Sequence, residues 1–267
     1  MPNNLRIFDN NLCLGTSVVL SISSAQTTVP GTNILQPNRK QVWRSISGTT
    51  AATAVFDLGA ARDVNTFGLV SGNLGTAGTV TVQGHTADSW ATPTYNSGAL
   101  AVYDNDYTGV LLYYLGATKN LRYWRAILDD PGNADNYLEA GVAWLGTYSA
   151  MERNFSYGWE IEPVSLSRTV YALDGTPYTD EMGEYRRIAL DVKFLTEEFA
   201  VTTFLPLIKR VSDKKDVILA LFPERRGDEG TALEHGLNFY GRIEGPRLRN
   251  TSSWRWGVSL SFRETPG

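Results

Sequence analysis

The sequence predicts an all-β fold with a minor α-helical part: a jelly-roll β-sandwich followed by a β-barrel or open antiparallel sheet with one packed helix. Short segments rich in β-branched and apolar residues recur between turn-forming residues along the chain, as in β-sandwiches. Several of them alternate apolar and polar residues with a period of two, and one segment, about 196–211, has helical spacing. We therefore expect a sandwich over residues 1–150 and a second β domain over residues 151–267.

In the first half, strands are expected at five segments that alternate with turn signals: 17–23, 53–58, 66–70, 79–83 and 110–115. Val80 and Val82 share one face of their strand, whereas the continuous apolar run at 110–115 suits a strand buried on both faces. Two long polar stretches, 24–41 and 84–109, separate these strands. Because loops of this length are uncommon in compact domains, we expect them to carry function or contacts.

In the second half, strands are expected at 155–166, 185–195, 216–222, 235–244 and 254–263. Within 185–195, the apolar residues Ile188, Leu190, Val192 and Phe194 alternate with residues that suit a solvated face. The last segment has a strict period of two, which places Trp254 on the same face as the apolar residues that follow it. One buried face and one solvated face are therefore expected for this sheet.

The helix expected at 196–211 has recognisable ends. Thr196 can cap its N-terminus, and Glu197 and Glu198 lie in the first turn, where the helix dipole favours acidic side chains. Pro206 should kink or divide the helix, because its ring and missing N–H disturb the preceding turn. The apolar stripe expected to face the sheet consists of Phe199, Val201, Phe204, Leu205 and Ile208.

Composition and charge exclude several classes of protein. The 267 residues are 42% hydrophobic and 19% charged, which suits a folded core, and the formal charge of −4 argues against a nucleic-acid partner. Apolar runs long enough for membrane insertion are absent, and the N-terminal segment lacks the features of a secretory signal. The lone Cys13 excludes an internal disulfide and is expected to be a small buried residue. We therefore expect a chain kept in a cytoplasm or built into a particle assembled there.

Candidate catalytic residues are few, and we expect no enzyme. His85 and His235 stand without a second ligand at zinc-site spacing, and the sequence contains no G-x-S-x-G motif. Paired carboxylates could indicate a glycosidase, although nothing in the sequence brings two of them to the required separation. A solvated or interface role is the alternative for these carboxylates, which are Glu139, Glu160, Glu162, Asp174, Asp180, Glu181 and Glu184.

An acidic segment at 129–136 allows two interpretations. Asp129, Asp130 and Asp135 supply hard oxygen ligands that could hold a structural Ca²⁺. The alternative is that the Asp, Pro, Gly and Asn residues of this segment simply form a turn, and the EF-hand pattern is not present.

Aromatic residues in the 84–109 region are the candidate binding surface. Trp90, Tyr95, Tyr103 and Tyr107 occur among Asp and Asn side chains, a mixture that could stack on a sugar ring. The same mixture would serve a protein–protein contact, because Trp and Tyr dominate interface hot spots.

Basic residues concentrate in the second half, where acidic residues are interleaved with them. Such mixed surfaces fit complementary contacts between subunits of a ring. Lys209, Arg210, Arg225 and Arg226 are the candidate ring or docking contacts, the last two in a charged loop at 223–230. A solvated hairpin tip is the other interpretation of that loop.

Three segments of the first half carry a family resemblance: Trp43-Arg44-Ser45, residues 55–59 (Val-Phe-Asp-Leu-Gly) and residues 122–146. Together they resemble the jelly-roll modules of the galactose-binding-like superfamily, also called discoidin or F5/8 type C modules. With Gly141 and Trp144-Leu145-Gly146 closing the module, the segment is most similar to the versions embedded in tail proteins of long-tailed bacteriophages.

The second half resembles the β-barrel-plus-helix domains of phage tail tube, tail terminator and distal tail proteins. The resemblance lies in a strand that ends in residues 194–198 (Phe-Leu-Thr-Glu-Glu), a short helix, a Lys/Arg-rich turn and two late strands. Distal tail proteins usually place the ring-forming domain first, and here the order is reversed.

The two resemblances imply a structural protein of a virion tail, assembled in the host cytoplasm, which joins the tail tube to tip or fibre proteins. The implied position is a distal tail, tail-tip or baseplate ring, and the implied partners are five further copies in a hexamer together with tube, hub and fibre proteins. No cofactor is implied. The alternative is a carbohydrate-binding adhesion module for a host-surface glycan, and a glycan-processing enzyme is the third hypothesis.

Overall fold

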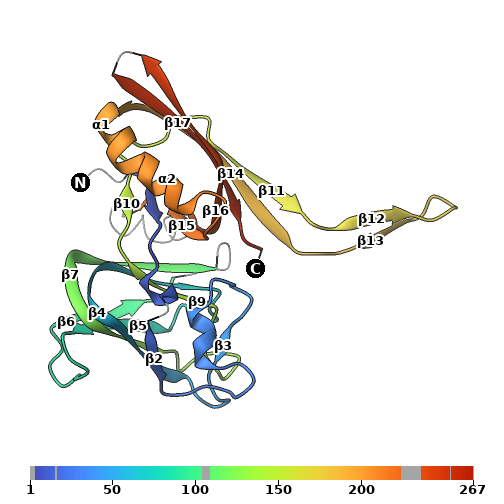
Figure 1. The fold of residues 1–267 in the computed structure, drawn as a ribbon. Helices are drawn as coiled ribbons and strands as arrows, with labels where there is room; N and C mark the ends of the chain where they lie inside the picture. Colours follow the sequence, from blue (N-terminus) through green and yellow to red (C-terminus); the bar gives the residue numbers. More distant parts are fainter. Residues whose placement is uncertain (1–3, 16, 104–108, 224–235, 253, 267) are drawn as a thin grey trace.

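The computed structural model describes residues 4–15, 17–103, 109–223, 236–252 and 254–266. The chain forms two β-rich parts, drawn one above the other in Figure 1, and each is built around an antiparallel sheet. A helical segment packs on the sheet of the second part, and a narrow β-ribbon projects from the same sheet (Figure 1). The predicted fold class, an all-β chain with one packed helix in the second part, is confirmed.

The first part is a sandwich whose longest strands bend. Its main sheet has the strand order β2 (Val19–Ile22), β4 (Ala51–Val70), β7 (Val110–Asp129), β5 (Thr79–His85) and β6 (Tyr95–Ala101), and β9 (Val142–Gly146) pairs with β4. One end of β4 pairs with β2 and the other with β9. The sequence pattern predicts two separate strands here, at 53–58 and 66–70. The structure instead continues the strand through a register shift after Asp57, where Gly59 adopts a φ of +76° that glycine tolerates.

Large aromatic side chains fill the core of the sandwich. Trp43, Phe56 and Trp124 are each at most 1% exposed, and they pack in one cluster with residues from most strands of this part. Trp43 begins the short strand β3 (Trp43–Arg44), which pairs with β8 (Glu139–Ala140) and closes one side of the core. Two 3₁₀ turns, η1 (Leu12–Leu14) and η2 (Gly31–Leu35), pack their apolar side chains against this core.

The second part is an open seven-stranded sheet. Its order is β10 (Ser149–Ala150), β1 (Arg6–Phe8), β15 (Val217–Ala220), β16 (Asn238–Ser252), β17 (Arg255–Glu264), β14 (Glu184–Thr196) and β11 (Glu160–Ser165). Strand β1 comes from the start of the chain, so residues 6–8 lie in the second sheet although the sequence analysis assigned them to residues 1–150. Ile7 and Phe8 are fully buried there. Their removal from water stabilises the pairing of β1 with the second sheet.

The predicted helix is confirmed as a continuous helical run made of α1 (Glu197–Phe199), a π-helical segment η3 (Ala200–Phe204) and α2 (Leu205–Val211). The Thr196 hydroxyl accepts a hydrogen bond from the Phe199 N–H at 3.3 Å, as expected for an N-cap. The Leu205 N–H bonds the Ala200 carbonyl five residues back, so the expected distortion at Pro206 takes the form of a π turn. Within the described ranges, no helix is both long and apolar enough to cross a membrane.

The predicted apolar stripe of this helix is partly wrong. Val201 and Leu205 are 48% and 45% exposed, whereas Leu207 and Val211 are buried against the sheet. The buried residues Ala200, Phe204, Leu207 and Val211 follow the regular helical spacing i, i+4, i+7 and i+11, so the buried face lies about one residue out of phase with the predicted stripe.

Two aromatic residues expected on the buried face of the sheet lie outside it. Phe194 is 59% exposed, because a register shift between Val192 and Leu195 turns Leu195 into the core in its place. Trp254 is 77% exposed at the end of the β16–β17 hairpin. Both residues have positive φ angles, +62° and +69°, which marks local departures from regular strand geometry.

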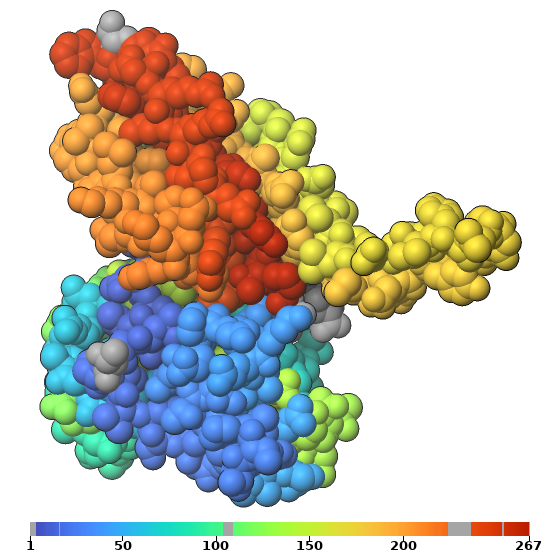
Figure 2. All heavy atoms as spheres, turned by 45° about the vertical axis from the view of Figure 1, so that its right-hand side comes forward, coloured from blue at the N-terminus to red at the C-terminus, as the bar shows by residue number. Residues whose placement is uncertain are grey.

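Residues 166–183 form the projecting ribbon, which we call the arm. It contains β12 (Arg168–Tyr171) and β13 (Pro177–Asp180), an antiparallel pair for which the sequence analysis predicted no strand. The arm stands clear of the rest of the chain in both views (Figures 1 and 2). At its tip, the Asp174 side chain accepts a hydrogen bond from the Thr176 N–H at 2.9 Å, and Gly175 has a φ of +84°.

The two parts share an apolar junction. Phe8, Ile218 and Tyr240 from the second sheet pack with Val70 and Trp144 from the sandwich in one buried cluster. The sequence between the two parts, residues 146–154, contains no Pro/Gly/Ser-rich linker, and the shared cluster shows that the two parts pack directly against each other.

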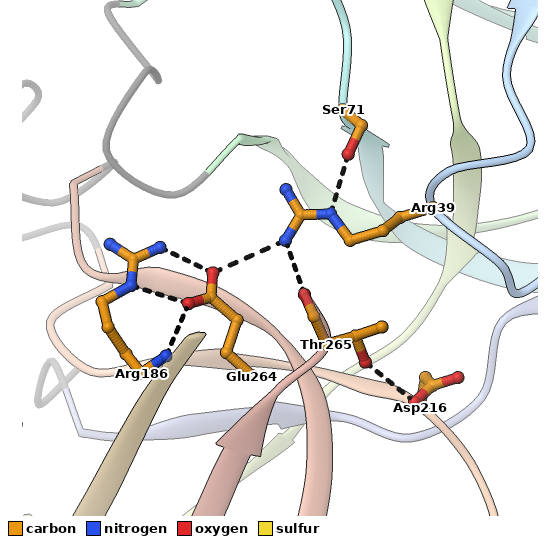
Figure 3. Close-up of polar contacts among 6 residues, drawn as sticks. All are labelled: Arg39, Ser71, Arg186, Asp216, Glu264 and Thr265. Carbon is orange, nitrogen blue, oxygen red and sulfur yellow. Dashed lines mark hydrogen bonds and ion pairs between the residues drawn. The ribbon is translucent and has the colours of Figure 1, made fainter. Parts of the chain in front are cut away.

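An ionic network adjoins this cluster (Figure 3). Arg39 of the sandwich donates hydrogen bonds to the Ser71 hydroxyl at 2.8 Å and to the Thr265 carbonyl at 3.0 Å. It also lies 3.5 Å from Glu264, whose carboxylate accepts two hydrogen bonds from the Arg186 guanidinium at 2.7 and 2.6 Å. The Arg39 and Glu264 side chains are 7% and 5% exposed, so this junction is almost free of solvent.

Candidate interaction surfaces

The predicted aromatic residues do not form one platform. Tyr95 and Tyr103 pack partly buried against the sandwich core, with Tyr95 6.1 Å from Trp124 between ring centres. Trp90 lies apart from them in the segment between β5 and β6. Tyr107 lies outside the described residues.

Trp90 is the centre of a small polar cluster. Its indole N–H donates to the Asp88 carboxylate at 2.7 Å, and the Arg125 guanidinium lies 4.6 Å from the ring centre. Arg125 is held in turn by hydrogen bonds to the Gln83 side-chain oxygen, one of them at 2.8 Å. Desolvation lowers the pKa of Arg125. An aromatic ring among fixed, planar polar groups is chemically suited to contact a sugar or a polar protein segment.

The acidic segment at 129–136 is held by hydrogen bonds within the chain. The buried Asp130 carboxylate accepts from the Gly75 N–H at 2.8 Å and from the Asn133 amide at 3.1 Å. Asp135 accepts from the Asn73 amide at 3.0 Å. Across the described ranges, no three His, Cys, Asp or Glu side chains gather closely enough to hold a metal ion. These hydrogen bonds support the turn interpretation of the segment.

The other candidate reactive groups are separated from each other. Cys13 is fully buried, and burial raises the pKa of its thiol. His85, at the end of β5, accepts a hydrogen bond from the Ala87 N–H at 2.9 Å, and His235 lies outside the described residues. Among the carboxylates considered for a glycosidase, Glu139 pairs with Arg44 in the sandwich, whereas Asp174 lies at the tip of the arm.

The four basic residues predicted as docking contacts have different surroundings. Lys209 and Arg210 are exposed in the last turn of α2. Arg210 pairs with Asp9 of the N-terminal segment, so its charge is already neutralised by a residue of the same chain. Arg225 and Arg226 lie outside the described residues.

The arm is the largest feature that the sequence analysis did not predict. Val170 and Tyr178 are paired across its two strands and are 51% and 65% exposed on one face. Tyr171 is 70% exposed on the opposite face, and Leu173 is fully exposed at the tip. The sequence signal that marks the arm is Asp174-Gly175, a frequent hairpin turn, between segments rich in Thr and Tyr.

A groove of about 640 Å³ lies on the face of the second sheet that is opposite the helix. Its floor is formed by small side chains of β14 and β17, which are Ala189, Ser259 and Ser261. Its rim carries Lys193, Arg247 and Arg249 together with Glu160, Asp191 and Glu244, and the loop at 156–159 borders one side. The lining is therefore mostly polar and charged, and its larger apolar members are Trp159, Leu190 and Leu260.

Neither a known family model nor a curated protein sequence matches the chain. Solved structures with a low similarity to it include sugar-binding proteins. A GH29 fucosidase of Ruminococcus gnavus in complex with fucose has 13% identity and a TM-score of 0.45, over 55% of this chain and 28% of the fucosidase.

Two smaller sugar-binding domains match a similar share of the chain. The family 32 carbohydrate-binding module of Clostridium perfringens NanJ, in complex with galactose, has 14% identity and a TM-score of 0.41, over 54% of this chain and 99% of the module. The lectin domain of lectinolysin, complexed with Lewis B antigen, has 16% identity and a TM-score of 0.40, over 51% and 95%. In each case the likeness extends over about half of this chain.

Proposed function

We propose that this chain is a non-catalytic assembly protein, whose arm joins it to a neighbouring subunit. The observation that carries the proposal is the exposure of large apolar side chains on both faces of the arm, including Val170, Tyr171 and Tyr178. A two-stranded ribbon has little stability of its own, and exposed apolar clusters commonly mark contact sites. Burial of each such side chain against a partner would contribute at most about 1.5–3 kcal/mol, the range for complete burial of a large apolar side chain.

The setting that we propose for this assembly is the one implied by the sequence resemblance. The chain would be a tail-tip, distal tail or baseplate protein of a long-tailed phage, with other copies of itself and with tube, hub and fibre proteins as neighbours. The second part would form the ring, expected to be six-fold, and the sandwich would be displayed on it. The low-similarity structures described above do not bear on this setting.

Deletion of the arm tests the assembly function. A variant in which residues 166–183 are replaced by a two-residue Asn-Gly turn keeps β11 and β14 joined as a hairpin. Sedimentation velocity of the full-length protein over a wide concentration range should show oligomers that the variant fails to form. Equal oligomerisation of both proteins, or a monomer in both at the highest concentration, would contradict the proposal. Thermal melting of the variant controls for loss of the fold.

The second candidate function is glycan binding by the sandwich, and the Trp90 cluster favours it. Trp90, Asp88, Arg125 and Gln83 place an aromatic ring and several planar polar groups together on one surface. Stacking of a sugar on an aromatic ring with hydrogen bonds from such groups is the usual chemistry of carbohydrate recognition.

A glycan array tests this second candidate. Trp90→Ala should abolish any glycan signal, whereas Trp254→Ala should preserve it, because Trp254 is an exposed tryptophan in the other part of the chain. Absence of binding by the unmodified protein, or equal binding by both variants, would exclude the Trp90 cluster as a glycan site.

A further inference from the structure

The arm and the groove of the second sheet have complementary shapes. The arm is a ribbon two strands wide, and the nine residues from Leu166 to Asp174 extend it by roughly 30 Å at about 3.3 Å per residue. The groove is an open trough of about 640 Å³ with Ala189, Ser259 and Ser261 along its floor. Small side chains on the floor leave room for larger apolar side chains, such as those of Tyr171 and Leu173, to lie against the sheet.

The charges of the two surfaces are also complementary. The arm contains three carboxylates, Asp174, Asp180 and Glu181, and one cation, Arg168. The groove rim contains three cations, Lys193, Arg247 and Arg249, none of which forms an ion pair with another described residue. Of the acids at the rim, Glu244 already pairs with Arg263 at 3.7 Å. Glu160 and Asp191 likewise form no ion pair with a described residue, so the unpaired charges of the rim are three cations and two carboxylates. This excess of one positive charge is opposite in sign to the excess negative charge of the arm.

The arm of the same molecule does not occupy this groove. It leaves the sheet beyond β11 and β14 and points away from the body of the chain in both views (Figures 1 and 2). The groove lies over β14, β16 and β17 of that body. An arm that reaches this face must therefore come from another molecule.

We propose that the tip of the arm, residues 171–177, docks into the groove of a second copy of this chain. Tyr171 and Leu173 pack on the floor formed by Ala189, Ser259 and Ser261, and the Asp174 carboxylate of the tip approaches Arg247 and Arg249. The contact joins two different surfaces, so repetition of it generates a ring or a chain of subunits. This inference rests on the proposed assembly function and names the surface that receives the arm.

Engineered cysteines test this placement directly. Leu173→Cys in one sample and Ser261→Cys in another should form a disulfide-linked dimer when the two are mixed under mild oxidation. The buried Cys13 is shielded from the reaction. The matched control is Ser21→Cys, which places a thiol on the exposed strand β2 of the sandwich. Cross-linking of Leu173→Cys to Ser261→Cys alone supports the proposal; equal cross-linking to both partners, or none, overturns it.

Charge reversal separates this inference from the proposed function. Arg247→Glu with Arg249→Glu should weaken self-association by about ten-fold, because each exposed ion pair accounts for a few-fold in Kd. Adding Asp174→Lys at the tip of the arm should restore the association. If Leu173→Asp abolishes the oligomer while the groove variant assembles normally, the arm docks elsewhere, which overturns this inference and leaves the proposed function intact. If neither variant changes the oligomer, both fail.

Discussion

Replacement of Arg39 by methionine tests whether the ionic network of Figure 3 holds the two parts of the chain together. Methionine retains most of the apolar stem and removes the guanidinium. The variant loses the hydrogen bonds from Arg39 to the Ser71 hydroxyl and the Thr265 carbonyl, at 2.8 and 3.0 Å, and its ion pair with Glu264 at 3.5 Å. Burial lowers the pKa of Arg39 while the nearby Glu264 carboxylate opposes that shift, which shows that the charge depends on its partner.

The expected cost follows from what remains buried. Removal of one member of a buried ion pair typically costs about 3–5 kcal/mol, because the other charge loses its partner. Glu264 keeps both hydrogen bonds from Arg186 in this variant, so we expect the lower end, about 3 kcal/mol. For a chain of this size that loss corresponds to a decrease in Tm of roughly 6–12 °C.

Thermal and urea denaturation measure this change, and Arg263→Met provides the matched control. Arg263 pairs with Glu244 at 3.7 Å, and their side chains are 46% and 36% exposed, so its loss should cost less than about 1 kcal/mol. A decrease in Tm that is equal in the two variants would refute the reasoning, because the buried network would then contribute no more than a surface pair.

Three further predictions follow from single contacts. Gly146→Ala should destabilise the fold by several kcal/mol in urea denaturation, because the new Cβ would overlap the Asn10 carbonyl oxygen; wild-type stability would contradict this packing. The Arg122 guanidinium holds the pKa of Asp57 below its usual value, so Asp57→Asn should be less stable than wild type at pH 7. The gap should close as the pH falls through that depressed pKa, and a gap independent of pH would exclude the mechanism. The buried Cys13 thiol should react with a thiol reagent only after denaturant is added, and fast reaction in the native protein would show that it is accessible.

The sequence was most informative where one local signal decided the structure. Thr196 followed by two acids predicted the start of the helix, and the alternation from Ile188 to Val192 predicted a buried face. It was misleading where a local irregularity changed the period. The bulge before Leu195 exposes Phe194 and has no simple residue signature. Val201 is exposed because the predicted helix stripe was about one residue out of phase with the buried face.

Contacts between residues far apart in the sequence were the second feature that the sequence pattern did not predict. Strand β1 inserts between β10 and β15, and no pattern within residues 6–8 specifies partners more than 140 residues away. The buried contact of Arg39 with Glu264 likewise joins two residues far apart in the sequence. Such contacts depend on how the two sheets pack, which local propensity does not encode.

Of the two candidate interaction surfaces, the sequence predicted the one around Trp90 and did not predict the arm. Trp90 was predicted as a contact residue from composition, and it does stand among polar partners at the surface, although the function of that cluster remains a proposal. The arm was overlooked because Leu166, Val170 and Leu173 belong to a segment with no continuous apolar face. Its apolar residues are divided between two faces, and an interaction surface with that pattern does not resemble a strand that packs on its own core.

Hydrogen–deuterium exchange of the arm at increasing protein concentration tests the central claim most directly. If the arm binds a neighbouring subunit, the amides of residues 168–180 should exchange rapidly in dilute solution and more slowly as the protein associates, while the sandwich core stays unchanged. Exchange of these amides at the same fast rate at every concentration would contradict the account, because the exposed apolar faces of the arm would then have no partner among copies of this chain.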